Sequence, residues 1–406
     1  MNKITSTPLQ IPSLKVAFET ADYQKNIYQY FADFHASTPV FSTPDGVIYL
    51  TRFADCQNLL KGKHFSRRPV TGPSVFSNEA REQNAFEEIL NDWMVYQDPP
   101  QHTRLRTQLN QIFLPTRISI MEDDIRSIAT SLLNEFRDNE TIEFVSRFAY
   151  LMPISVICAM LHVDEKDYEQ FRLWSRDLTA ALNTGSDEDI ALGIAAANAL
   201  KDYFMRHLDQ KFERGGDDIL NALLKATDAR ELSLEEAANV CVFMIWAGHE
   251  TTKLLIANGL LLLIQHPEQL QKLRARPELL NSAIEEMLRY ESPIQKISRW
   301  TREDTMFSDY LVPANTLVTA ILGAAHRDPD EFDQPHRFLI ERIPNRHLAF
   351  GSGIHHCLGV YLARLEARIA FEEILKRCRN ISLVDYHWRP LSAFRSLDKL
   401  ELIIEP

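Results

Sequence analysis

The interpretation of this sequence depends on one stretch, Phe350-Gly351-Ser352-Gly353-Ile354-His355-His356-Cys357-Leu358-Gly359. Three glycines stand at fixed offsets around a single cysteine, and an apolar pattern with helical spacing follows over residues 360–375. We expect a tight glycine-rich loop that presents one sulfur just before the N-terminus of a helix. Backbone N–H groups and the helix dipole favour a thiolate at such a position. A structural thiol in a turn is the alternative, but an inert buried cysteine needs no cage of glycines.

The composition narrows the class of protein. The chain has 406 residues and a formal net charge of −12, with 45% hydrophobic and 25% charged residues, as in an ordinary soluble protein. This acidity argues against a nucleic-acid binder, which needs a basic face. The N-terminal segment lacks the apolar region of a signal peptide, and the longest apolar run, Leu254–Ile264, is too short to span a bilayer. We therefore expect a cytoplasmic protein that binds neither nucleic acid nor membrane.

Helical spacing of apolar residues dominates the chain and predicts one large, mostly helical domain. The predicted helices include residues 117–136, 145–161, 165–182 and 187–212. The best-marked helix follows Ser233, where Ser233 and Glu236 fit a capping box, and it runs to Gln265. Because its middle is apolar all round, we expect it to pass through the centre of the molecule. Near the N-terminus, Pro39–Phe53 predicts a β-hairpin that turns at Pro44-Asp45-Gly46.

The central helix contains one anomalous segment, Ala247-Gly248-His249-Glu250-Thr251-Thr252. Glycine, a charge and two β-branched residues are poor choices for a buried helix interior. The segment is either a local kink with a solvated charge or a place where another group approaches the backbone. These residues alone leave both interpretations open.

Five motifs together resemble the cytochrome P450 family, and they occur in the order that the family has. Phe350–Gly359 matches the haem-binding loop at every position of its F-G-x-G-x-H-x-C-x-G pattern. Ala247–Thr252 is similar to the family's oxygen-activating signature, and Glu286 with Arg289 is similar to its E-x-x-R pair. The other two motifs are the H-T-R-L-R segment 102–106 and the segment 332–338, whose Arg337 corresponds to the arginine that joins the E-x-x-R pair. A lone E-x-x-R would mean little, but the ordered set is specific.

This resemblance implies the cytochrome P450 fold, which is mainly α with a small β region. We expect one domain over residues 1–406, with β structure at about 39–53 and 294–320 and helices in the remainder. The implied activity is that of a haem-thiolate monooxygenase, which inserts one atom of O₂ into a small organic substrate. No G-x-G-x-x-G opens a helix after a strand, so electrons are expected from a separate ferredoxin or flavodoxin and its reductase. Oxidative coupling, desaturation or C–C cleavage is the alternative chemistry, and a non-catalytic haem-binding protein is the alternative class.

The resemblance also implies roles for individual residues around a haem b. Cys357 would be the axial thiolate ligand of the iron, which favours O–O cleavage, with Phe350 beside the sulfur. Other residues implied to contact the haem are Gly351, Gly359, Ala247 and Gly248, together with the propionate-binding side chains His102, Arg106, Arg299 and His355.

On the oxygen side of the haem, Gly248 is expected to leave room for dioxygen. Thr251 and Glu250 are implied to be catalytic, delivering protons through the hydroxyl and through a carboxylate that reaches solvent. Glu286, Arg289 and Arg337 are expected to form a structural network. His249 is given no role.

Substrate and partner contacts are predicted from the apolar and basic residues of the implied fold. A predominantly apolar substrate is expected from the contact candidates Phe76, Phe86, Trp93, Phe243, Met244, Ile294 and Phe394. A redox partner is expected to dock over Cys357 on a basic patch of Arg346, Arg364 and Arg368, unless internal ion pairs occupy these side chains.

Overall fold

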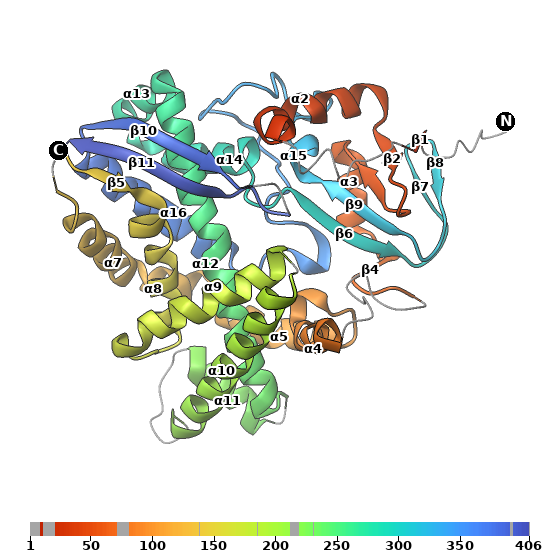
Figure 1. Ribbon diagram of the computed structural model, residues 1–406, viewed down its shortest axis with the longest axis horizontal. Coiled ribbons are helices and arrows are strands. Elements are labelled where there is room, and N and C mark those ends of the chain that lie inside the picture. Colours follow the sequence, from red (N-terminus) through yellow and green to blue (C-terminus); the bar gives the residue numbers. More distant parts are fainter. Residues whose placement is uncertain are drawn as a thin grey trace.

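A computed structural model describes residues 9–10, 21–70, 81–137, 139–184, 186–211, 219–229, 231–389 and 393–405. Helices make up most of the structure, and Figure 1 shows the longest of them, α12, running through the middle of the molecule. The first helices in the chain are α2 (Ala21–Ser37), α3 (Phe53–Lys61), α4 (Arg81–Asn91), η1 (Met94–Tyr96), α5 (Gln101–Ile112), α6 (Pro115–Ile120), α7 (Glu122–Asn134), the π-helix η2 (Val145–Ala149) and α8 (Leu151–Met160).

The remaining helices follow from residue 165 onward and include the central one. They are η3 (Glu165–Asp167), α9 (Tyr168–Thr184), α10 (Asp187–Lys211), α11 (Ile219–Asp228), α12 (Leu234–Gln265), α13 (Pro267–Ala275), η4 (Pro277–Leu279), α14 (Leu280–Tyr290), α15 (Leu322–Ala325), η5 (Gly353–His355) and α16 (Val360–Arg377). The predicted helix 117–136 is divided into α6 and α7 at Met121, and the helix predicted at 145–161 begins with the π-helix η2.

The capping box predicted for α12 is present. The Ser233 hydroxyl accepts a bond from the Glu236 N–H at 3.0 Å, and the Glu236 carboxylate accepts the Ser233 N–H at 2.8 Å. The helix packs against α8, α10, α14 and α16, and its apolar side chains form the middle of the main hydrophobic core. By length and composition this helix could cross a membrane, but 72% of its most apolar window is buried inside the fold. Burial on all sides explains the apolar composition without a membrane.

The β structure is divided between two places, with the six-stranded sheet on the right of Figure 1 and the sheet of β5, β10 and β11 on the left. A six-stranded sheet has the order β1-β2-β3-β9-β6-β4, and β2 and β3 form the predicted hairpin. The strands are β1 (Leu9–Gln10), β2 (Val40–Ser42), β3 (Ile48–Leu50), β4 (Phe65–Ser66), β6 (Lys296–Thr301) and β9 (Leu317–Ile321), and a separate hairpin joins β7 (Thr305–Phe307) to β8 (Tyr310–Val312).

One part of the secondary-structure prediction is wrong. The residues after α16 were expected to be helical, but β10 (Asn380–Trp388) and β11 (Leu397–Glu405) form an antiparallel pair, and β5 (Thr141–Glu143) adds to β11. Burial alternates along β11, with Leu400, Leu402 and Ile404 inside the core. This two-residue period is that of a strand packed on one face, and the sequence contained it.

Candidate active site

The loop that precedes α16 has the glycine-dependent geometry expected of it. Gly351 and Gly353 have φ values of +69° and +71°, in the region that favours glycine. A Cβ on Gly353 would also lie 2.5 Å from the carbonyl oxygen of Leu60, so α3 approaches the loop too closely for a side chain. The Cys357 N–H donates to the Phe350 carbonyl at 2.8 Å, which closes the loop around the cysteine.

The surroundings of Cys357 act on its thiol in opposite directions. Burial raises the pKa of the thiol, whereas the Gly359 N–H and the charges of Arg106 and Arg364 lower it. In the protein alone burial prevails. A cation bound at the sulfur would add the missing stabilisation of a thiolate.

The four predicted propionate-binding residues come together as a cluster of cations and imidazoles. The rings of His102 and His355 lie 4.3 Å apart, and Arg299 is only 6% exposed. Burial, reinforced by Arg299, His102, Arg67 and Arg106, lowers the pKa of His355 to about 2. Burial and Arg106 likewise lower the pKa of His102. Such a concentration of positive charge suits an anionic group.

Arg67 is a member of this cluster that the sequence analysis missed, because it lies in no motif. Its guanidinium donates to the carbonyls of Val95 and Ser298, both at 2.8 Å, which holds it beside Arg299. Burial lowers the pKa of Arg67 and lowers that of Arg299 much further. No spacing in the sequence links these two arginines, which come from segments more than 200 residues apart.

One face of α12 differs from the rest of the helix because its residues are partly exposed. From Val242 to Lys253 five residues of this otherwise buried helix retain accessible surface, namely Phe243, Trp246, Ala247, Gly248 and Thr251. Phe243, Trp246, Ala247 and Thr251 follow the helical period and form one stripe, whereas Gly248 lies toward α8. These are the residues of the helix middle that the neighbouring elements leave partly uncovered.

Glu250 does not reach solvent, in contrast to the expectation. It is 4% exposed and forms a short ion pair with Lys253, while the His249 Nε2 atom lies 3.6 Å from the carboxylate. Burial opposes the ionisation of Glu250, but Lys253 and His249 outweigh it and lower its pKa. The missed signal was the presence of Lys253 three residues further along the same helix, a spacing that brings side chains together.

Gly248 also has a different environment from the one expected. A Cβ there would lie 2.5 Å from the Ile157 Cδ1 atom of α8, so the glycine allows α8 and α12 to pack closely. The Thr251 hydroxyl donates to the Ala247 carbonyl at 3.3 Å, and Thr251 belongs to the exposed stripe. Thr252 bonds in the same way to Gly248 but is buried off the stripe.

Glu286 and Arg289 form a buried network, but the predicted third member is wrong. Arg289 makes two bonds of 2.8 Å to Glu286 and also donates to the carbonyls of His326, Pro335 and Arg337. The Arg337 side chain turns outward to Gln334, and it is Arg342 that reaches Glu286, at 3.1 Å. Both arginines lie in one irregular segment, whose side-chain directions no periodic pattern specifies.

The aromatic candidates for substrate contact gather around Trp246. Its ring stacks on Trp93 at 5.4 Å, and those of Phe243 and Phe394 lie 6.5 and 6.3 Å away. A β-bridge between Ile294 and Phe394 brings one further candidate, Ile294, to the same place.

Three candidates are placed differently. Phe86 is buried against α10 near Gly193, Met244 is buried off the exposed stripe, and Phe76 lies outside the described residues.

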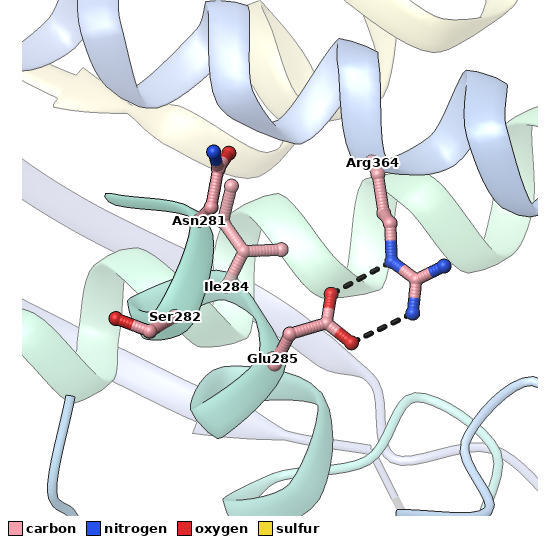
Figure 2. A pocket seen from close by; sticks show the side chains of 5 residues that line it. All are labelled: Asn281, Ser282, Ile284, Glu285 and Arg364. Carbon is pink, nitrogen blue, oxygen red and sulfur yellow. Dashed lines mark hydrogen bonds and ion pairs between the residues drawn. The ribbon is translucent and has the colours of Figure 1, made fainter. Parts of the chain in front are cut away.

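The predicted docking patch is largely occupied by internal ion pairs. Figure 2 shows Arg364 held by both oxygens of Glu285, at 2.7 Å each, beside a surface pocket of about 240 Å³. Arg368 pairs with Glu122 and Glu372. Of the three arginines, only Arg346 belongs to the exposed class of residues.

Glu366, on α16, is a buried acid to which the sequence analysis gave no role. It is 0% exposed, and neither carboxylate oxygen has a hydrogen-bond partner. Burial raises its pKa well above the ordinary value and so disfavours the charged form.

The residues present fit a haem. Both ring nitrogens of His102 are buried and lack partners among the described residues, as expected of groups that would bind an anionic substituent. Arg106 acts on both His102 and Cys357, which places the cation cluster near the sulfur.

Comparisons with known proteins agree with this arrangement. The family model "Cytochrome P450" matches residues 6–384. The chain is 35% identical to the biotin biosynthesis cytochrome P450 of Bacillus subtilis, over 97% of this chain and 100% of that protein. It is 33% identical to the cytochrome P450 monooxygenase PikC of Streptomyces venezuelae, over 96% and 94% of the two chains. A solved structure of P450BioI, in complex with an acyl carrier protein ligated to hexadec-9Z-enoic acid, superposes with a TM-score of 0.88 at 35% identity, over 95% and 99%. The chain therefore belongs to the cytochrome P450 family, whose members are haem-thiolate monooxygenases.

Proposed function

We propose that this protein uses haem b to insert one atom of O₂ into a predominantly apolar small organic substrate, while the other atom becomes water. The observation that carries the proposal is the pair of buried, unpartnered ring nitrogens of His102 within a cation cluster that also acts on Cys357. His102, Arg106, Arg299 and His355 would hold the propionates, and Cys357 would ligate the iron. When bound, the haem supplies the iron at which O₂ is reduced, and thiolate ligation favours O–O cleavage.

The chain's own residues would manage protons and orient the substrate. The Thr251 hydroxyl can donate one hydrogen bond and accept another, and its carbonyl partner Ala247 keeps it on the exposed stripe. Glu250 would pass protons to it from the buried cluster with His249 and Lys253. Trp246 and the three aromatic rings around it favour an apolar substrate portion, because they offer large apolar surface at one end of the stripe.

Electrons would come from a separate ferredoxin or flavodoxin with its reductase, and the protein would work in the cytoplasm. We place partner docking on the outer face of the Cys357 loop. This face carries the exposed apolar side chains Ile354 and Tyr361 together with the exposed Arg346. Since Arg364 and Arg368 are internally paired, the docking surface is smaller and more apolar than three free arginines would make it.

A spectral test and a turnover test decide the proposal. The reduced protein with carbon monoxide is expected to show the long-wavelength Soret band of a thiolate-ligated haem. Cys357→Ala should abolish this band, and Cys378→Ala, which removes another buried thiol, should keep it. Persistence of the band in Cys357→Ala would mean that another residue is the ligand. Turnover with a surrogate ferredoxin and reductase, followed by product analysis, separates oxygen insertion from coupling, desaturation or C–C cleavage. A haem-loaded protein that shows no turnover at all would be a haem-binding protein and not an enzyme.

A further inference from the structure

One carboxylate, that of Glu285 on α14, holds two residues that touch the segment before Cys357. Its two oxygens accept bonds of 2.7 Å from the Nε and Nη2 atoms of Arg364 on α16 (Figure 2). Its Oε2 atom also lies 3.1 Å from the Nε2 atom of His347, whose side chain is 3% exposed. Glu285 therefore connects α14, α16 and the start of the loop segment.

Both partners of Glu285 reach directly into that segment. The Arg364 guanidinium lies over the Phe350 ring, 4.7 Å from its centroid, and Phe350 accepts the Cys357 N–H. On the other side, the His347 Nδ1 atom accepts the Ala349 N–H at 3.2 Å. The charge of Arg364 thus stands next to the one aromatic residue whose backbone closes the loop around the sulfur.

Glu285 is ionised at neutral pH in spite of its burial. Burial opposes the ionisation of Glu285, but the hydrogen bonds from His347 and Arg364 outweigh it and lower its pKa to about 2. Arg364 is also one of two cations that favour the thiolate form of Cys357. The pair is partly exposed, 39% for Arg364 and 27% for Glu285, so solvent screens part of its field.

We propose that Arg364 and Glu285 set the reduction potential of the haem bound at Cys357, as positioning residues and not as catalytic ones. The inference rests on the proposed function, because it requires Cys357 to be the iron ligand. Reduction adds one electron to the centre, so a cation facing the loop stabilises the reduced state and a nearby anion destabilises it. Glu285 is bound to the guanidinium of Arg364 and offsets part of its charge.

The test uses two variants that break the same ion pair but remove opposite charges. Glu285→Gln should make the potential of the haem-loaded, substrate-free protein more positive, and Arg364→Met should make it more negative. Each shift should correspond to at least a roughly threefold change in the equilibrium constant of reduction, with a tenfold change equal to about 59 mV for one electron. Arg364→Lys keeps the charge and should restore most of the parent potential.

Arg368→Met is the matched control. It removes the same charge one turn further along α16, from a side chain that pairs with Glu122 and Glu372 and is not stacked on Phe350. Its potential should equal that of the parent protein.

A purely structural role for the pair predicts a different pattern. Loosening of the loop would move Glu285→Gln and Arg364→Met in the same direction, and that outcome, or no shift in either loaded variant, would overturn the proposal. If Arg364→Met does not take up haem, the reduction potentials of Glu285→Gln and Arg364→Lys decide between the two roles. Absence of the thiolate band in the parent protein would instead refute the proposed function itself.

Discussion

The ammonium of Lys253 and the carboxylate of Glu250 are in contact one turn apart on α12, and both side chains are more than nine-tenths buried. A buried charge requires a partner of opposite sign, because the free energy lost when the charge leaves water is not regained by an unpaired charge in the protein interior. Around this pair stand His249 on the same helix, Tyr150 before α8, and Arg389 after β10. The proposed proton relay therefore begins with an acid that its own helix keeps ionised.

Lys253→Met should destabilise the protein by about 3–5 kcal/mol at neutral pH, because it leaves the carboxylate of Glu250 buried with weaker partners. The folded-state pKa of Glu250 is lowered, so the pair's contribution is present above the unfolded value of 4.5 and is lost as the pH falls through the folded value. The gap between variant and parent should therefore narrow in acid, as urea unfolding at several pH values would show. Lys272→Met, which breaks an exposed pair with Glu341, is the control and should cost about 1 kcal/mol or less. Equal costs for the two variants would contradict the buried pairing.

Thr251→Ala should separate electron consumption from product formation. The substitution removes the hydroxyl on the exposed stripe but little volume, so substrate binding and reduction should survive. We expect NAD(P)H consumption to continue, product per NAD(P)H to fall roughly tenfold or more, and hydrogen peroxide to account for most of the difference. Thr252→Ala removes the neighbouring hydroxyl, which is buried off the stripe, and should leave the ratio unchanged. Equally efficient coupling in Thr251→Ala would assign the relay to another group.

Glu366→Leu should stabilise the protein by about 1–3 kcal/mol, because it replaces a buried acid that lacks hydrogen-bond partners by an apolar side chain of similar size. The pKa of Glu366 is higher in the folded state than in the unfolded state. The free-energy cost of burying this acid is therefore smallest below the unfolded pKa, and the parent protein loses stability relative to the variant as the pH rises above it. Urea unfolding of both proteins from acid to neutral pH measures the difference. A variant that is less stable at every pH would show that the carboxyl has a partner in the working protein.

Three arginine variants test the network around Glu286. Arg289→Ala and Arg342→Ala leave the buried carboxylate short of partners and should reduce both haem content and stability, by about 3–5 kcal/mol for Arg289. Arg337→Ala removes a side chain that faces Gln334 and should change stability by no more than about 0.5 kcal/mol. Absorbance of the purified proteins gives the haem content. Severe loss in Arg337→Ala with a benign Arg342→Ala would reverse the assignment made from the structure.

Local signals in the sequence predicted much of the fold and the site. The capping residue Ser233 and the glycines around Cys357 determine the backbone conformation only of residues close to them in the sequence. The structure contains the helix start and the left-handed backbone conformations that they predict. The exchange of Arg337 for Arg342 could not be foreseen, because an irregular segment has no period that fixes side-chain direction. Arg67 and Trp246 joined their clusters only through tertiary packing. Lys253 was different, since its three-residue spacing from Glu250 was visible in the sequence.

The bonds that Arg289 makes have a consequence for how the cofactor would be captured. Its guanidinium fixes the carbonyls of His326, Pro335 and Arg337, which follow it by 37 to 48 residues. His326 in turn accepts the Leu348 N–H at 2.8 Å, so the restraint extends to the loop that carries Cys357. All of these groups belong to the chain itself, and the conformational entropy of the long connection is therefore lost when the protein folds. Haem would then enter a receptor that is already rigid, and more of its contact energy would remain as affinity.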